Sequence, residues 1–167
     1  GGSASIAELL GADSLTARVM GGPSDLFGYN EMWNSPDILA AEMPSYNGVG
    51  DARSLARLYA ALVGEVDGIR LLGPRQLQLA CEEQVRGPDA VIFQETSFGL
   101  GYALQPMLAP GAGPACFGHQ GAGGALAFAD PDTGLAFSYI MNEMRFDPEG
   151  DPRSRRLVEA TYACLEN

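Results

Sequence analysis

The chain has 167 residues, of which 46% are apolar and 19% charged, and its formal net charge is −11. This composition is typical of a folded globular protein and argues against a disordered chain. Because the basic surface that a nucleic-acid-binding protein needs is absent, we expect no nucleic acid partner.

The first half of the chain predicts helices joined by an irregular loop. Apolar side chains recur at helical spacing over residues 4–22 and are interrupted at Gly11, which predicts two short helical pieces. Residues 21–44 are rich in Gly, Pro, Asn and Ser but also contain several aromatic side chains. We therefore predict an irregular loop over 21–44 that packs against a face of the core rather than a flexible linker.

Two further helices are predicted before the chain turns to strands. Residues 52–63 have leucines and a tyrosine three and four positions apart, the spacing of an amphipathic helix, and Asp51 is placed to cap it. A second helix is predicted over 74–84, with Pro74 in its first turn.

The second half predicts three strands over residues 98–142 and a closing helix over 152–165. Residues 98–104 alternate small and large side chains, and two apolar runs at 124–129 and 135–141 flank a turn that contains Pro and Gly. Strands adjacent in sequence usually pair antiparallel, so the fold class expected is α+β, an antiparallel sheet with packed helices. We expect residues 1–167 to form a single domain or a fragment of one.

Cysteine and lysine usage restrict the chemistry. The three cysteines, Cys81, Cys116 and Cys164, are odd in number and widely spaced, so we predict no disulfide framework and a cytoplasmic location, unless an N-terminal signal is missing from the sequence. No apolar run approaches the roughly 20 residues of a membrane span. All ten basic residues are arginines, so no mechanism that needs a lysine amine can run within these residues.

The run FGHQGAGGALAFADPDTGLAFSYIMN, residues 117–142, resembles the third motif and following hairpin of the serine β-lactamase and penicillin-binding-protein superfamily. It is most similar to class C β-lactamases and the related carboxylesterases. The segments SYNGVGDARSLARLYAALVG and FGLGYAL resemble the helix and strand that precede this motif, so the resemblance covers residues 43–165. It implies the C-terminal part of a β-lactamase/transpeptidase-like fold.

The resemblance also implies site residues. His119, Gln120 and Gly121 take the place of the Lys-Thr-Gly or His-Thr-Gly motif and would contact substrate, with His119 in the cation position. The backbone N–H of Ala122 would form half of an oxyanion hole, which stabilises the negative charge of a tetrahedral intermediate. An alignment on Gly123-Gly124 instead would shift this motif by one residue.

The other two motifs of the family are absent from the chain. It contains no Ser-x-x-Lys and no Tyr-x-Asn. We therefore expect the C-terminal portion of a serine hydrolase, an esterase for small acyl esters, whose nucleophile lies outside these residues and which is inactive alone. The alternatives are a β-lactamase or D-amino-acid peptidase of the same superfamily, or a non-catalytic binding module. We expect two partners: a small acyl substrate, and a protein segment that covers the open sheet, which is either the N-terminal half of the same enzyme or a second chain. No cofactor is expected.

Other interpretations of the same residues have weaker patterns. A self-contained triad around His119, the only histidine, lacks the Gly-x-Ser-x-Gly elbow. A metal site at Cys116 and His119 lacks a second ligand pair, so no metal is expected. Residues 147–151 lack the spacing and the final glutamate of a calcium loop. Without the family resemblance, His119 is best interpreted as a histidine that bonds a loop backbone.

Overall fold

The computed structural model describes residues 8, 10–21, 31–46, 48–145, 147 and 150–165. The chain divides into two compact units, one drawn from residues 1–49 and 88–94 and the other from 50–87 and 95–167. The expectation of a single domain or fragment over 1–167 stays a prediction.

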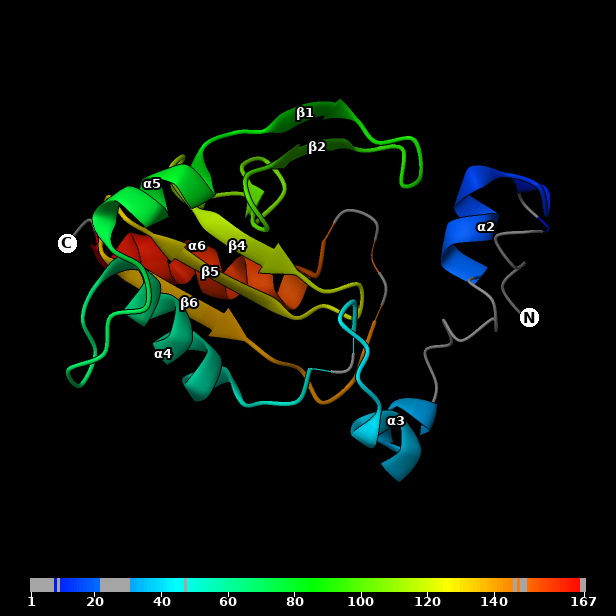
Figure 1. Cartoon of the computed structure of the whole chain (residues 1–167), viewed down its shortest axis with the longest axis horizontal. Helices are drawn as coiled ribbons and strands as arrows, with labels where there is room; N and C mark the ends of the chain where they lie inside the picture. Colours follow the sequence, from blue (N-terminus) through cyan, green and yellow to red (C-terminus); the bar gives the residue numbers. More distant parts are fainter. Residues whose placement is uncertain are drawn as a thin grey trace. The chain divides into compact units, whose positions relative to one another are not determined.

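Helices come first along the chain, strands follow and one helix closes it, as the sequence predicts (Figure 1). The helices are α2 (Leu15–Gly21), the 3-10 helix η1 (Glu31–Asn34), α3 (Pro36–Ala40), α4 (Ala52–Val63), α5 (Pro74–Cys81) and α6 (Pro152–Leu165). The strands are β1 (Val85–Pro88), β2 (Glu95–Phe98), β3 (Ala103–Leu104), β4 (Phe117–Gln120), β5 (Leu126–Asp130) and β6 (Leu135–Tyr139).

The first unit corrects the prediction of an irregular loop over 21–44. The described part of that stretch contains η1 and α3, while residues 22–30 lie outside the described residues. The α3 helix forms because Ser35 accepts a hydrogen bond from the backbone N–H of Ile38 at 3.4 Å and Pro36 occupies the first helical position. Packing of the aromatic side chains was expected, and the ring of Trp33 meets that of Tyr46 edge-on with 5.3 Å between centroids.

In the second unit, α4 and α5 form where the spacing of apolar residues predicts them. The Asp51 carboxylate accepts the backbone N–H of Ser54 at 2.8 Å and so caps α4. Pro74 opens α5, which ends at Cys81, three residues before the predicted end at position 84.

The six strands form one sheet in the order β1-β2-β3-β4-β5-β6, with antiparallel pairing from β2 to β6. The prediction of one strand over 98–104 is wrong, because β2 ends at Phe98 and β3 begins at Ala103. Between them the backbone turns, with Gly101 at φ +86° and the N–H of Gly99 bonded to the carbonyl of Tyr102. A left-handed residue of this kind is a turn position that glycine adopts at no steric cost. Residues 98–142 therefore hold β3 to β6 rather than three strands.

Helices cover both faces of the sheet in the second unit, with α4 and α5 in front of the strands and α6 behind them in Figure 1. One apolar cluster joins Tyr59 and Leu62 of α4 to Phe117 and Ala127 of the sheet. The other cluster lies on the opposite face and joins Val158 of α6 to residues that include Ala103, Leu126 and Phe128. The predicted fold class, an antiparallel sheet with packed helices, is confirmed, and the closing helix runs over the predicted residues 152–165.

The β6 strand ends the sheet. It pairs with β5 on one side, and no other described strand pairs with it. Its five residues are all half-buried. Among the described residues, no helix combines the length and the apolar character that crossing a bilayer requires.

Candidate active site

The end of β4 presents an open strand edge. On one side β5 pairs along the whole strand, with His119 opposite Ala127 and Gln120 opposite Leu126. On the other side the pairing with β3 reaches only Phe117 and Gly118. His119 is exposed and Gln120 half-buried, so this end of β4 has backbone and side chains available to a ligand.

Gly118 sets how closely β4 approaches β5. A Cβ atom at this position would overlap the carbonyl oxygen of Ala127 and lie 2.6 Å from both the Cα and the Cβ of Phe128. Only glycine fits here because the contacts are with backbone and with the root of a buried side chain. The position of His119, one residue further along, depends on this close approach.

Residues 121–125 connect β4 to β5 as a tight loop, called here the glycine loop. The N–H of Gly121 is bonded to the carbonyl of Ala125 at 2.7 Å, and the N–H of Gly124 to the carbonyl of Gly121 at 2.9 Å. Ala122 is exposed at the start of this loop, whereas Gly123 is buried. The four residues predicted as a site, His119 to Ala122, therefore lie on one continuous stretch at the open edge.

The His119 ring has two close neighbours. Its Nδ1 lies 2.7 Å from the carbonyl oxygen of Gln120, and a carbonyl only accepts, so Nδ1 carries the hydrogen. In the neutral imidazole Nε2 is then an acceptor. The second neighbour is the half-buried Phe98 of β2, whose ring centroid is 6.4 Å from that of His119 with 33° between the planes. No sequence pattern predicts this contact, which arises because a tight turn joins β2 to β3, the strand that pairs with β4.

An ion pair lies behind the glycine loop. The Asp151 side chain, 4% exposed, accepts hydrogen bonds from Nε and Nη2 of Arg153. Gly124, at φ +106°, lies so close to this pair that a Cβ atom would be 3.1 Å from Cγ of Asp151 and 3.2 Å from Nη2 of Arg153. The pattern Asp151-Pro152 is a helix start that the sequence does signal, but nothing in it signals that Arg153 reaches the loop.

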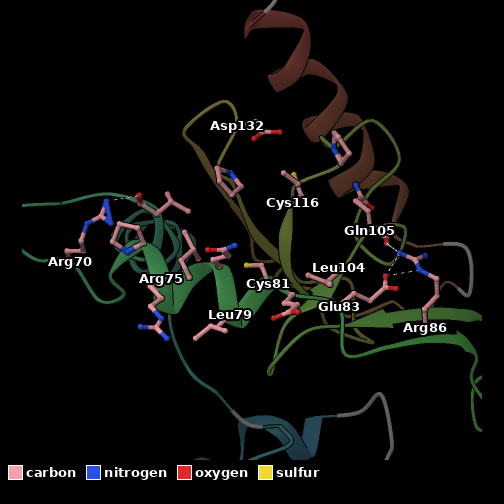
Figure 2. A pocket seen from close by; sticks show the side chains of 18 residues that line it. Arg70, Arg75, Leu79, Cys81, Glu83, Arg86, Leu104, Gln105, Cys116 and Asp132 are labelled. Atoms are coloured by element: carbon pink, nitrogen blue, oxygen red, sulfur yellow. Dashed lines mark hydrogen bonds and ion pairs between the residues drawn. The ribbon is translucent and has the colours of Figure 1, made fainter.

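A groove in the second unit lies away from His119 to Ala122. This groove of about 870 Å³ lies at the other end of β4, between α5, the residues that precede β4 and the β5–β6 turn (Figure 2). Cys81, Leu104 and Cys116 are drawn around its middle, and none of His119 to Ala122 lines it. Burial raises the pKa of both thiols to about 11, so each is protonated near neutral pH and neither is an activated nucleophile.

Cys116 and Asp151, which belong to the alternative metal and calcium interpretations, are bonded to other side chains. The Cys116 sulfur lies 3.1 Å from the hydroxyl of Tyr162, which donates to the buried carboxylate of Asp130 at 2.7 Å. Asp151 is bonded to Arg153, and Glu149 is outside the described residues. Over the part of the chain that the structure describes, no group of three His, Cys, Asp or Glu side chains is arranged to hold a metal ion.

Sequence comparison identifies the family to which this edge and loop belong. The family model described as beta-lactamase matches residues 11–162. The chain belongs to the beta-lactamase family. This is a family of serine hydrolases, and its relatives include proteins named as esterases, so the expected resemblance over residues 43–165 is confirmed and extends toward the N-terminus.

Three relatives are similar over much of the chain. The Esterase/beta-lactamase LipL of Mycobacterium tuberculosis is 41% identical over 113 residues, which are 64% of this chain and 25% of that protein. The crystal structure of a penicillin-binding protein homologue from Caulobacter crescentus is 43% identical with a TM-score of 0.68, and the match covers 74% of this chain and 34% of that one. A family VIII carboxylesterase structure is 33% identical with a TM-score of 0.74, covering 89% of this chain and 39% of the other.

The chain thus spans between a quarter and two fifths of the length of these relatives. This partial coverage agrees with the expectation that it corresponds to a portion of a longer family member.

Proposed function

We propose that the chain is the C-terminal portion of a serine hydrolase that cleaves small acyl esters through an acyl-serine intermediate. The nucleophilic serine and its lysine neighbour lie outside residues 1–167. The observation that carries this proposal is the open end of β4, where His119 and Gln120 lead directly into an exposed Ala122 on a loop held by its own backbone hydrogen bonds.

The residues of this chain would act on the reacting carbonyl and its surroundings. Attack by the serine places negative charge on the former carbonyl oxygen, and the N–H of Ala122 donates to that oxygen. His119 and Gln120 contact the substrate beside the reacting carbon, and Gly121 lets it approach the backbone closely.

The side chain at position 119 favours an ester over a β-lactam. A lysine at this position would offer a compact positive charge on a long flexible stem, which suits a substrate carboxylate. This chain has His119 there instead, whose Nδ1 is bonded to the Gln120 carbonyl, so the lysine that would pair with a β-lactam carboxylate is missing. The name of the similar family VIII carboxylesterase supports the same preference.

The test compares substrates and variants in the full-length protein. Turnover of a chromogenic short-chain ester should exceed that of a chromogenic β-lactam and of a D-alanyl-D-alanine peptide. Replacing His119 or Gln120 with alanine should lower kcat/KM for the ester by about tenfold, the value of one lost hydrogen bond. The exposed Gln76 of α5 supplies the matched control, since Gln76→Ala should leave kcat/KM unchanged.

Each contrary result selects an alternative. Faster turnover of the β-lactam or the peptide would replace the esterase with the corresponding family activity. If no substrate is turned over and no serine is acylated, the non-catalytic binding module is the correct interpretation.

A further inference from the structure

The glycine loop rests against an ion pair at the start of α6, in which the Asp151 carboxylate is buried and the Arg153 side chain half-buried. Asp151 has only 4% of its side chain exposed, and Nε of Arg153 donates to both of its carboxylate oxygens at 2.9 Å. Nη2 of Arg153 donates to the same carboxylate at 2.5 Å. A guanidinium that donates from two of its nitrogens is fixed in orientation as well as in position, because its planar pair of N–H donors matches the two oxygens of the carboxylate.

The same guanidinium also holds the segment that follows β6. Its Nη1 donates to the carbonyl of Glu143 at 3.1 Å, and the N–H of Arg145 donates to the carbonyl of Gly123 at 3.0 Å. Arg153 is therefore bonded to two elements, the start of α6 and residues 143–145, and the second of these is bonded to the glycine loop.

The fit between this pair and the loop leaves no free space. At Gly124 a Cβ atom would meet the carboxylate of Asp151 and the guanidinium of Arg153. At Gly123 it would lie 2.8 Å from Cγ of Met144. The backbone of the glycine loop is thus packed on the ion pair at Gly124, while Ala122 is an exposed residue of the same loop.

We propose that Arg153, oriented by Asp151, is a positioning residue that holds the glycine loop so that the N–H of Ala122 points at the reacting carbonyl oxygen. The inference rests on the proposed function, because the loop needs this precision only if it stabilises an oxyanion. An oxyanion donor is effective when it is fixed before the reaction, and a displacement of about 1 Å can cost about a hundredfold in rate. Arg153 would touch neither the substrate nor the reacting atoms.

The experiment compares Arg153→Ala with Arg156→Ala in the full-length protein. Arg156 lies one turn further along α6 and is exposed, so its removal controls for the loss of one arginine from this helix. Arg153→Ala should lower kcat for the ester by about 10- to 100-fold, with little change in KM, because the donor acts on the transition state. Its affinity for a boronic acid, whose adduct with serine is tetrahedral, should fall by the same factor as kcat/KM. Arg153→Lys keeps the positive charge but lacks the planar pair of N–H donors, so its kcat should lie between those of Arg153→Ala and the wild-type protein.

Hydrogen exchange supplies a measurement that does not depend on catalysis. Backbone amides of residues 121–125 should exchange at least about tenfold faster in Arg153→Ala than in Arg156→Ala, because the loop loses its support. If the wild-type protein hydrolyses no ester, the proposed function fails, and the exchange result still decides whether Arg153 holds the loop. Equal exchange in the two variants, or an unchanged kcat in an active enzyme, would overturn the inference. A lower kcat in Arg153→Ala with boronic acid affinity unchanged would also overturn it, since the oxyanion site would then be intact.

Discussion

Replacing Gly118 with alanine is expected to force β4 away from β5. The added Cβ would overlap the Ala127 carbonyl and lie 2.6 Å from two atoms of Phe128, a buried residue at the middle of β5. Neither neighbour is the flexible end of a side chain, so the strands themselves must separate by about 1 Å to restore ordinary van der Waals contact.

The cost can be assembled from the contacts. Overpacking a dense core costs about 1–3 kcal/mol, and weakening one strand hydrogen bond adds about 1 kcal/mol. Substituting alanine for glycine returns about 0.4–1 kcal/mol by restricting the unfolded chain. The free energy of unfolding should therefore fall by about 2 kcal/mol, a factor of about 30 in the unfolding equilibrium.

Urea unfolding of the full-length protein measures this directly, with Gly50→Ala as the matched control. Gly50 is exposed, and a Cβ there meets nothing within 4 Å, so its substitution should change the free energy of unfolding by less than about 0.5 kcal/mol. If Gly118→Ala were no less stable than Gly50→Ala, the close approach of β4 and β5 that places His119 would be wrong.

The buried groups around α6 give two further predictions. Burial alone would raise the pKa of Asp130, but hydrogen bonds, foremost that from Tyr162, hold the pKa below its ordinary value of 3.8. The ionised Asp130 therefore stabilises the fold above about pH 4, and this contribution is lost as the pH falls through the folded pKa. Tyr162→Phe should lower the free energy of unfolding by about 1–3 kcal/mol at pH 7 and by less below pH 4, and a difference that is constant from pH 2 to 7 would contradict this role. In thiol labelling at pH 8, the exposed Cys164 should react rapidly, while Cys116, which is 1% exposed with a pKa of about 11, should react only on unfolding. Equal labelling rates for the two thiols would count against the burial of Cys116.

Elements whose signal is local could be predicted from the sequence. The α4 helix combines apolar spacing with a capping residue at Asp51, and both are contained within about a dozen residues. The hairpin of β5 and β6 is likewise marked by its apolar runs and by the turn between them. The α3 helix contradicts the predicted loop although Ser35-Pro36 is a cap followed by a proline at the first helical position, because five residues are too few to show an apolar spacing among the surrounding Gly, Pro and Asn residues.

Features that depend on tertiary packing could not be predicted. The β3 strand has two residues, too few for any periodicity, and exists only because it pairs with β2 and β4. Asp130 is typical of an exposed turn by sequence, yet it is 1% exposed and bonded to Tyr162, 32 positions away. The contact between Gly124 and the ion pair of Asp151 with Arg153 likewise joins residues far apart in the chain. The sequence indicated which residues form the edge of the candidate site, but not what supports them.

The most direct test of the account is to locate the acyl group during turnover. The full-length protein is mixed with a slowly hydrolysed ester, quenched, and analysed by intact mass and peptide mapping. We predict a single acyl adduct on the serine of a Ser-x-x-Lys sequence outside residues 1–167, which accumulates less in His119→Ala. An adduct on any residue within this chain, or ester hydrolysis with no acyl adduct at all, would contradict it.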